Sequence, residues 1–213
     1  MVASAALTAA LLDSDRAVPR AVAARAPRCP TRAASTRVAA ALRNAEARYA
    51  LESRGTVSDV DINQIAHDAR LIGALSAGRP TEALAAANRQ LVRHVVQTRV
   101  TRGVRVLVDA NASSFDVSGP QTPLYGWRGR YLGELRITVQ DVIGFIKLVH
   151  KFGAADVVVR GPVQARASLA VALGVPLSES GCVKIAQRRY AVRSFTEASF
   201  TGEPLKIWVL TAA

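Results

Sequence analysis

The spacing of apolar residues changes near the middle of the chain, from a helical period to a strand period. In residues 35–51, Val38, Leu42, Ala45 and Tyr49 recur every three or four positions, which is the spacing of one face of an amphipathic helix. Similar stripes and good helix formers predict further helices in the N-terminal half, at 2–12, 16–26, 62–75 and 81–98. The first hundred residues are therefore expected to be mainly helical.

Beyond residue 100, apolar and polar positions alternate, as in strands that bury one face. The clearest case is residues 131–139, where Leu135 and Ile137 alternate with polar neighbours. At Asp141 the apolar spacing becomes helical again, so Asp141 is predicted to cap a helix over 142–152. Other strands are expected over 104–108, 115–117, 125–127, 155–160, 182–186, 190–195 and 205–210 and, as either a strand or a short helix, over 165–173.

The predicted order, helices first and then a mainly antiparallel sheet with short helices, is that of an α+β protein. A chain of 213 residues, half of them apolar, is long enough to bury a core and to carry a helical extension. We therefore expect an N-terminal helical extension over 1–34 and a single domain over 35–213. Within that domain, helices are expected over 35–99 and a sheet over 100–213.

The net charge is +12 and the pI about 10.9, values that raise the question of a nucleic-acid partner. The charge is spread evenly, because 1–100 and 101–213 each contain 14 basic and 8 acidic residues and no run of five like charges occurs. Aromatic residues make up only 5% of the chain, too few for a stacking platform on single strands. A basic, cytoplasmic nucleic-acid-binding module is therefore an alternative and not the main interpretation.

The chain lacks the common signatures of catalytic and metal sites. It has no P-loop, no GxGxxG after a strand and no nucleophile elbow, so we expect neither an enzyme nor a cofactor. The three histidines are far apart, and no cysteine or paired acid stands at metal-ligand spacing, so no metal site is expected. The two cysteines, Cys29 and Cys182, are either unrelated buried thiols or one long-range disulfide in an oxidising compartment.

Several segments, in this order, resemble bacterial extracytoplasmic sensor domains of the Cache type. They are a long amphipathic helix, then "VLVDANAS", "GRYLGELRITVQD", "ADVVVRGP" and finally "RRYAVRSF" with "GEPLKIWVL". The resemblance covers roughly residues 35–213. Cache domains are PAS-like, with a long N-terminal helix packed on an antiparallel sheet. The resemblance implies an extracytoplasmic domain that senses or binds a small molecule in signal transduction.

In such a fold, a ligand lies between the sheet and the segment that covers it, and polar side chains converge there from apolar strands. Arginines at such a site favour a carboxylate or another anion, because a guanidinium binds one through two hydrogen bonds. The resemblance therefore implies that the ligand contacts Arg136, Thr138, Arg160, Tyr190 and Arg193, with Tyr125 and Trp127 as a wall.

The resemblance also bears on compartment and partners. An extracytoplasmic location implies a disulfide between Cys29 and Cys182, and the N-terminal helices would offer a homodimer surface. The longest apolar run, residues 2–12, is only about half as long as a bilayer span, so membrane association is expected only through a segment outside this sequence. A structural or interaction domain without a ligand is the remaining alternative.

Overall fold

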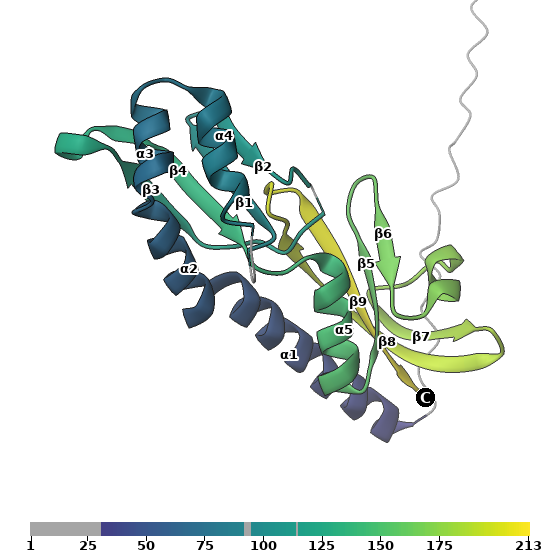
Figure 1. Cartoon of the computed structure of the whole chain (residues 1–213). Coiled ribbons are helices and arrows are strands. Elements are labelled where there is room, and N and C mark those ends of the chain that lie inside the picture. The colour runs from purple at the N-terminus through teal and green to yellow at the C-terminus, as the bar shows by residue number, and fades with distance from the viewer. Residues whose placement is uncertain (1–30, 92–94, 114) are drawn as a thin grey trace, which may run out of the picture.

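The strands form two separate antiparallel sheets in the computed structural model, which describes residues 31–91, 95–113 and 115–213 (Figure 1). The first sheet has the order β2-β1-β4-β3, with β1 (Gln97–Arg102), β2 (Arg105–Ala110), β3 (Gln121–Tyr125) and β4 (Tyr131–Thr138). The second has the order β6-β5-β9-β8-β7, with β5 (Asp156–Arg160), β6 (Ala165–Ala167), β7 (Ser180–Ile185), β8 (Arg188–Ala198) and β9 (Pro204–Ala212).

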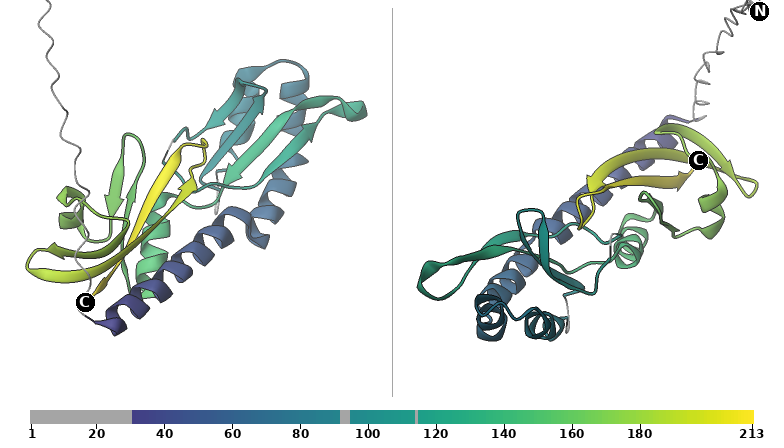
Figure 2. Two further views of the ribbon diagram at one scale, coloured as in Figure 1. Left: turned by 180° about the vertical axis from the view of Figure 1, so that it is seen from behind. Right: turned by 90° about the horizontal axis from the view of Figure 1, so that it is seen from above.

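The helices lie against one face of each sheet. They are α1 (Arg32–Arg54), α2 (Thr56–Ala66), α3 (Ala69–Ser76), α4 (Pro80–Asn88) and α5 (Val142–Gly153). The helices α1 and α2 follow one another along one side of both sheets (Figure 1, Figure 2). The α+β prediction is confirmed, but the strands expected in one sheet over 100–213 belong to two, and the single domain over 35–213 stays a prediction.

Each sheet has its own apolar core on the helix side. The first core joins α2, α3 and α4 to Leu135 and Ile137 of β4, and the second joins α1 and α5 to β5 and β9 around Phe145. On its other face the second sheet packs against the segment containing η2 (Ala170–Gly174), where Ala172 and Trp208 share a smaller cluster. No described helix covers the other face of the first sheet, and that face is polar.

The long helix α1 contacts the second sheet through a stripe of small side chains. Ala34, Val38, Ala41 and Ala45 are buried at intervals of three or four residues, as the helical period requires. Alanine carries no atoms beyond Cβ, so the helix backbone lies close to the strands. The helix begins at Thr31, whose side chain accepts a hydrogen bond from the Ala34 N–H over 3.1 Å.

Tyr49, at the end of that stripe, connects α1 to the place where the two sheets meet. Its side chain is buried and packs edge-on against Phe145, with ring centroids 5.5 Å apart. Its hydroxyl donates to the Ala198 carbonyl over 2.5 Å and accepts from the Ser118 N–H over 3.1 Å. Ala198 is the last residue of β8, and Ser118 lies just before β3. The Tyr49 hydroxyl therefore connects α1 to both sheets.

Some sequence predictions need correction, and others are confirmed. The helix expected over 81–98 ends at Asn88, and residues 97–102 form a strand, β1. Its sequence, QTRVTR, has Val100 as its one apolar residue, so the strand gives only a weak alternation signal. Asp141 caps α5 as predicted, since its carboxylate accepts from the Gly144 N–H over 2.6 Å. The helices expected over 2–12 and 16–26 lie outside the described residues.

Replacing the Tyr49 hydroxyl should destabilise the fold. In Tyr49→Phe, the Ala198 carbonyl and the Ser118 N–H lose a buried partner, which should lower the free energy of unfolding by about 1–3 kcal/mol. Urea denaturation measures this change. The matched control is Tyr125→Phe at a residue that is 52% exposed, which should change stability by no more than about 0.5 kcal/mol. Equal effects of the two variants would contradict the role given to Tyr49.

Stability should also depend on pH through Tyr49. Burial raises its pKa from 10.0 to about 12, opposed by the Ser118 N–H and assisted by the charge of Glu197. The folded state therefore favours the neutral phenol, so this contribution is complete below pH 10 and is lost as the pH rises through 12. Wild type should lose about 2–3 kcal/mol more than Tyr49→Phe over that range, measured by urea denaturation. Parallel pH profiles would refute this assignment.

Candidate functional site

The polar face of the first sheet forms the candidate site. Side chains alternate along a strand, so Val100 and Leu135 point toward the helices while Arg99 and Arg136 point to the opposite face. Arg99 and Arg136 are direct partners across the β1–β4 ladder. The β8–β9 turn of the second sheet reaches over this face. Between them lies a cavity of about 200 Å³, the junction pocket, lined by Arg99, Thr101, Gln121, Glu134, Arg136, Phe200 and Thr201.

The charge of Arg99 is paired with the carboxylate of Asp109. Its Nε and Nη2 donate to Asp109 Oδ2 over 3.1 and 2.6 Å, and Gln97 donates to Asp109 Oδ1 over 2.8 Å. The guanidinium also lies 5.5 Å from the centroid of the Phe200 ring. Arg99 is therefore held in place by neighbouring side chains and forms a wall of the pocket.

Arg136 differs, because its donors contact only neutral acceptors. Its Nε and Nη2 donate to Gln121 Oε1 over 3.2 and 2.5 Å, and its Nη1 donates to the Phe200 carbonyl over 2.8 Å. No carboxylate of the described residues forms an ion pair with it. Burial lowers the pKa of Arg136, and the positive charge of Arg99 lowers it further. An anion bound in the pocket would offset both effects on this pKa, because it favours the charged guanidinium.

Glu134 places a negative charge in the same pocket. It lies two residues before Arg136 and therefore on the same face of β4. Its carboxylate accepts from the Tyr131 hydroxyl over 2.8 Å and from Gln121 Nε2 over 3.3 Å. The pocket is thus lined by a guanidinium and a carboxylate, an arrangement suited to a ligand with a carboxylate at one end and a hydrogen-bond donor at the other.

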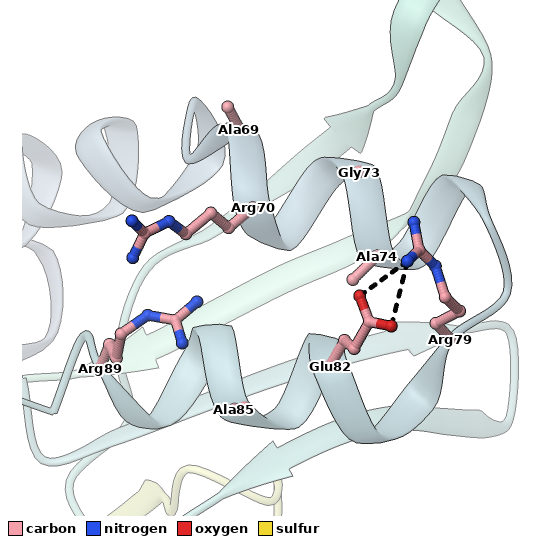
Figure 3. A pocket seen from close by; sticks show the side chains of 8 residues that line it. All are labelled: Ala69, Arg70, Gly73, Ala74, Arg79, Glu82, Ala85 and Arg89. Atoms are coloured by element: carbon pink, nitrogen blue, oxygen red, sulfur yellow. Dashed lines mark hydrogen bonds and ion pairs between the residues drawn. The ribbon is translucent and has the colours of Figure 1, made fainter.

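A larger hollow lies between α3 and α4, with a volume of about 410 Å³ (Figure 3). Arg79 pairs with Glu82 over 3.0 Å at one end of it, while Arg70 and Arg89 lie at the other end. The side chains of Arg79 and Glu82 are more than half exposed, and charges that keep their water bind ligands weakly. The half-buried guanidinium of Arg136 lies in a less polarisable environment, which makes the junction pocket the better candidate.

The seven residues predicted to bind a ligand lie in three different places. Arg136 lines the junction pocket. Thr138 is on the same face of β4 but is completely buried, and its hydroxyl bonds to the backbone of Gln140. Tyr125 and Trp127 are exposed at the far end of the β3–β4 hairpin, so they do not form a wall of this pocket.

The remaining three predicted residues belong to the second sheet. Arg160 donates to the carbonyls of Leu173 and Val175 over 3.1 and 2.9 Å. These bonds connect the η2 segment to the second sheet. Tyr190 is buried in the cluster beneath that segment. Arg193 is exposed on the other face of β8. These side chains do not share a pocket with Arg136, and their part in ligand binding stays a prediction.

Most residues of the junction pocket were missed by sequence reasoning. Arg99 and Thr101 flank Val100, the one apolar residue of β1, so the alternation was too weak to indicate a strand with one polar face. Phe200 carried no such signal, because its position over β4 depends on how the second sheet lies against the first.

Other predictions concern metals, membranes and cysteines. No three His, Cys, Asp or Glu side chains of the described part of the chain are placed to hold a metal ion. The described helices include none with the length and apolarity needed to span a bilayer. Cys182 lies on β7, but Cys29 is outside the described residues, so the Cys29–Cys182 disulfide stays a prediction.

Comparisons with known proteins support the fold. No family model and no curated protein matches the sequence significantly. Among solved structures, the chain is similar to the periplasmic domain of Vibrio cholerae LuxQ, with a TM-score of 0.50 and 13% identity over 84% of this chain and 100% of that one. A second structure of that domain gives a TM-score of 0.51 at 10% identity, over 84% of this chain and 98% of the other. This likeness supports a PAS-like α+β fold, and membership of the Cache type stays a prediction.

Proposed function

We propose that this chain is an extracytoplasmic, non-enzymatic sensor domain that binds a small carboxylic acid in the junction pocket. The observation that carries the proposal is Arg136, a half-buried guanidinium that lines a cavity and has only neutral hydrogen-bond partners among the described residues. Burying a charge without an ion-pair partner is costly, so a carboxylate bound there would be stabilised. The PAS-like fold shared with a periplasmic domain supports the location.

The size of the pocket limits the ligand. Its volume of about 200 Å³ lies below the range of about 300–1,000 Å³ that is typical of sites for drug-sized molecules. A short organic acid fits this volume. Glu134 adds a preference for a donor at the far end of the molecule, which an ammonium or hydroxyl group would supply.

Binding at Arg136 offers a route to the long helix. Arg136 holds the Phe200 carbonyl, and the Phe200 N–H donates to the Asp116 carbonyl over 2.9 Å. Two residues before Phe200, the Ala198 carbonyl accepts from Tyr49 on α1. A ligand that draws Arg136 away from Phe200 would therefore act on the turn that positions α1. In a homodimer that forms through the N-terminal helices, this displacement of α1 would be the signal.

Binding of small acids should depend on Arg136. We would screen paired compounds, such as succinate with aspartate and pyruvate with alanine, by isothermal titration calorimetry. Arg136→Gln keeps polar contacts but removes the charge, and it should weaken binding by at least about tenfold. Arg188→Gln is the matched control, since Arg188 is exposed at the β7–β8 turn. If no compound binds, or if both variants bind equally, the pocket is not the site.

The proposed compartment can be tested through the cysteines. An extracytoplasmic chain should carry the Cys29–Cys182 disulfide, because thiols are oxidised there. Thiol titration of denatured, unreduced protein from the native host should then find no free sulfhydryl, and reduction should release two. Two free sulfhydryls before reduction would support a cytoplasmic protein, including the nucleic-acid-binding alternative.

A further inference from the structure

The outer end of the first sheet carries exposed apolar side chains. We call this end the tip and define it by two turns, 102–106 between β1 and β2 and 125–131 between β3 and β4. Trp127 is 70% exposed and Val104 completely so, and lesser but substantial exposure is found at Val106, Tyr125 and Tyr131. An apolar cluster of this kind on a surface commonly marks an interaction site.

The tip lies far from the two chain ends that the structure describes. The start of α1 is next to the end of β9, where Arg37 donates to the Ala212 carbonyl over 3.0 Å. The β3–β4 hairpin projects at the opposite end of the molecule (Figure 1, Figure 2). The tip and the place where α1 begins and β9 ends therefore lie at opposite ends of the described part of the molecule.

Arginines surround the apolar side chains of the tip. Arg102 donates twice to the Leu132 carbonyl, over 2.9 and 2.7 Å, and Arg130 donates to the Ser76 carbonyl over 2.6 Å. These bonds fix the two side chains and connect the turns to β4 and α3, but they do not neutralise either charge. Arg105 and Arg128 are exposed, and none of these four arginines forms an ion pair within the described residues.

The β3–β4 turn has a left-handed backbone at its apex. Arg128 and Gly129, between β3 and β4, both have positive φ, 61° and 72°. A left-handed backbone at arginine is unfavourable, whereas glycine at that position would be free of strain. Tyr125 and Tyr131 flank the turn, with ring centroids 6.0 Å apart. The turn keeps an arginine at a position where glycine would be better for folding.

A hollow beside the tip could accept a partner's side chain. It has a volume of about 360 Å³ and lies between the α3–α4 turn and β2, lined by Leu75, Gly78, Arg79, Pro80, Arg102, Arg105, Val106 and Leu107. Its lining includes both apolar and cationic side chains. An acidic segment with an aromatic or aliphatic anchor would match both features.

We infer that the tip is a docking surface for an acidic segment of another protein that carries aromatic or aliphatic anchors. Tryptophan, tyrosine and arginine are the side chains most enriched at the centres of protein interfaces. The four arginines, which form no ion pair among the described residues, favour negative charge in the partner, and the same charges would repel a second copy of this tip. The exposed valines, Val104 and Val106, favour protein over nucleic acid, because phosphates gain nothing from aliphatic contacts.

A random peptide display library tests this inference, because it offers the tip acidic, basic and apolar residues in every combination. The immobilised chain serves as bait, and the library is first depleted on a Trp127→Ala, Arg128→Gly double variant. Enriched peptides should combine Asp or Glu with aromatic or aliphatic residues. A synthetic copy of the most enriched peptide should shift the fluorescence of Trp127, the exposed one of the two tryptophans, since Trp208 is 8% exposed.

Single variants then locate the binding of that peptide. Trp127→Ala and Arg128→Gly should each weaken it by about tenfold, and Arg128→Gly also relieves backbone strain, so a loss cannot be attributed to misfolding. Arg188→Glu, at an exposed turn of the second sheet, should leave affinity unchanged. No enrichment, enrichment of peptides without acidic residues, or affinity unaffected at the tip would overturn the inference. The inference would also be overturned if single-stranded DNA or phosphatidylglycerol vesicles bound the same residues more tightly than the peptide does. Self-association of the chain that both variants abolish would overturn it as well.

Discussion

The hydroxyl of Tyr49 connects α1 to both sheets, which share no strand among the described residues. The segment leading into β3 joins the sheets, because Val117 pairs with Ser199 while Phe115 and Val117 pack into the core of the second sheet. Tyr49 adds two hydrogen bonds at this place from a single atom, on a helix whose buried stripe of small side chains contacts the second sheet. The relative position of the sheets therefore depends on these directional contacts together with the apolar side chains packed beside them.

The junction pocket is a result of that arrangement. Its floor is the polar face of one sheet, and its cover is a turn from the other, held by Arg136 through the Phe200 carbonyl. A ligand bound in the pocket, as we propose, would contact both sheets at once. Binding would then be coupled to the relative placement of the sheets through the same hydrogen bonds, as is required of a domain that converts ligand binding into movement of a helix.

Periodicity predicted the elements that bury one apolar face. It found the segment of α1, the strand β4 with its transition into α5, and the Asp141 cap, because in each case burial follows the period of the backbone. It failed at β1, where Gln97, Thr98 and Arg99 are largely buried yet polar. From composition alone, such a strand is predicted to be the end of the preceding helix.

The candidate site was predictable only in part. Arg136 was found because it interrupts an apolar strand, whereas Phe200 and Thr201 enter the pocket from a distant turn. Their proximity depends on how one sheet is placed on another, and no local pattern in the chain encodes that placement. Arg160 was predicted from its position on a strand, and the structure adds that its Nη2 donates to the carbonyls of Leu173 and Val175, while its part in ligand binding stays a prediction.

The uncovered face of the first sheet has a consequence for how this fold can change over time. Of the side chains there, Glu134 and Arg136 line the junction pocket, and they can be exchanged without repacking the leucine and isoleucine positions on the helix side. If the proposed ligand binds there, chemical selectivity and folding stability depend on opposite surfaces of the same strands. A lineage with this architecture could then acquire new ligand preferences by substitution on one surface while the other continues to specify the fold.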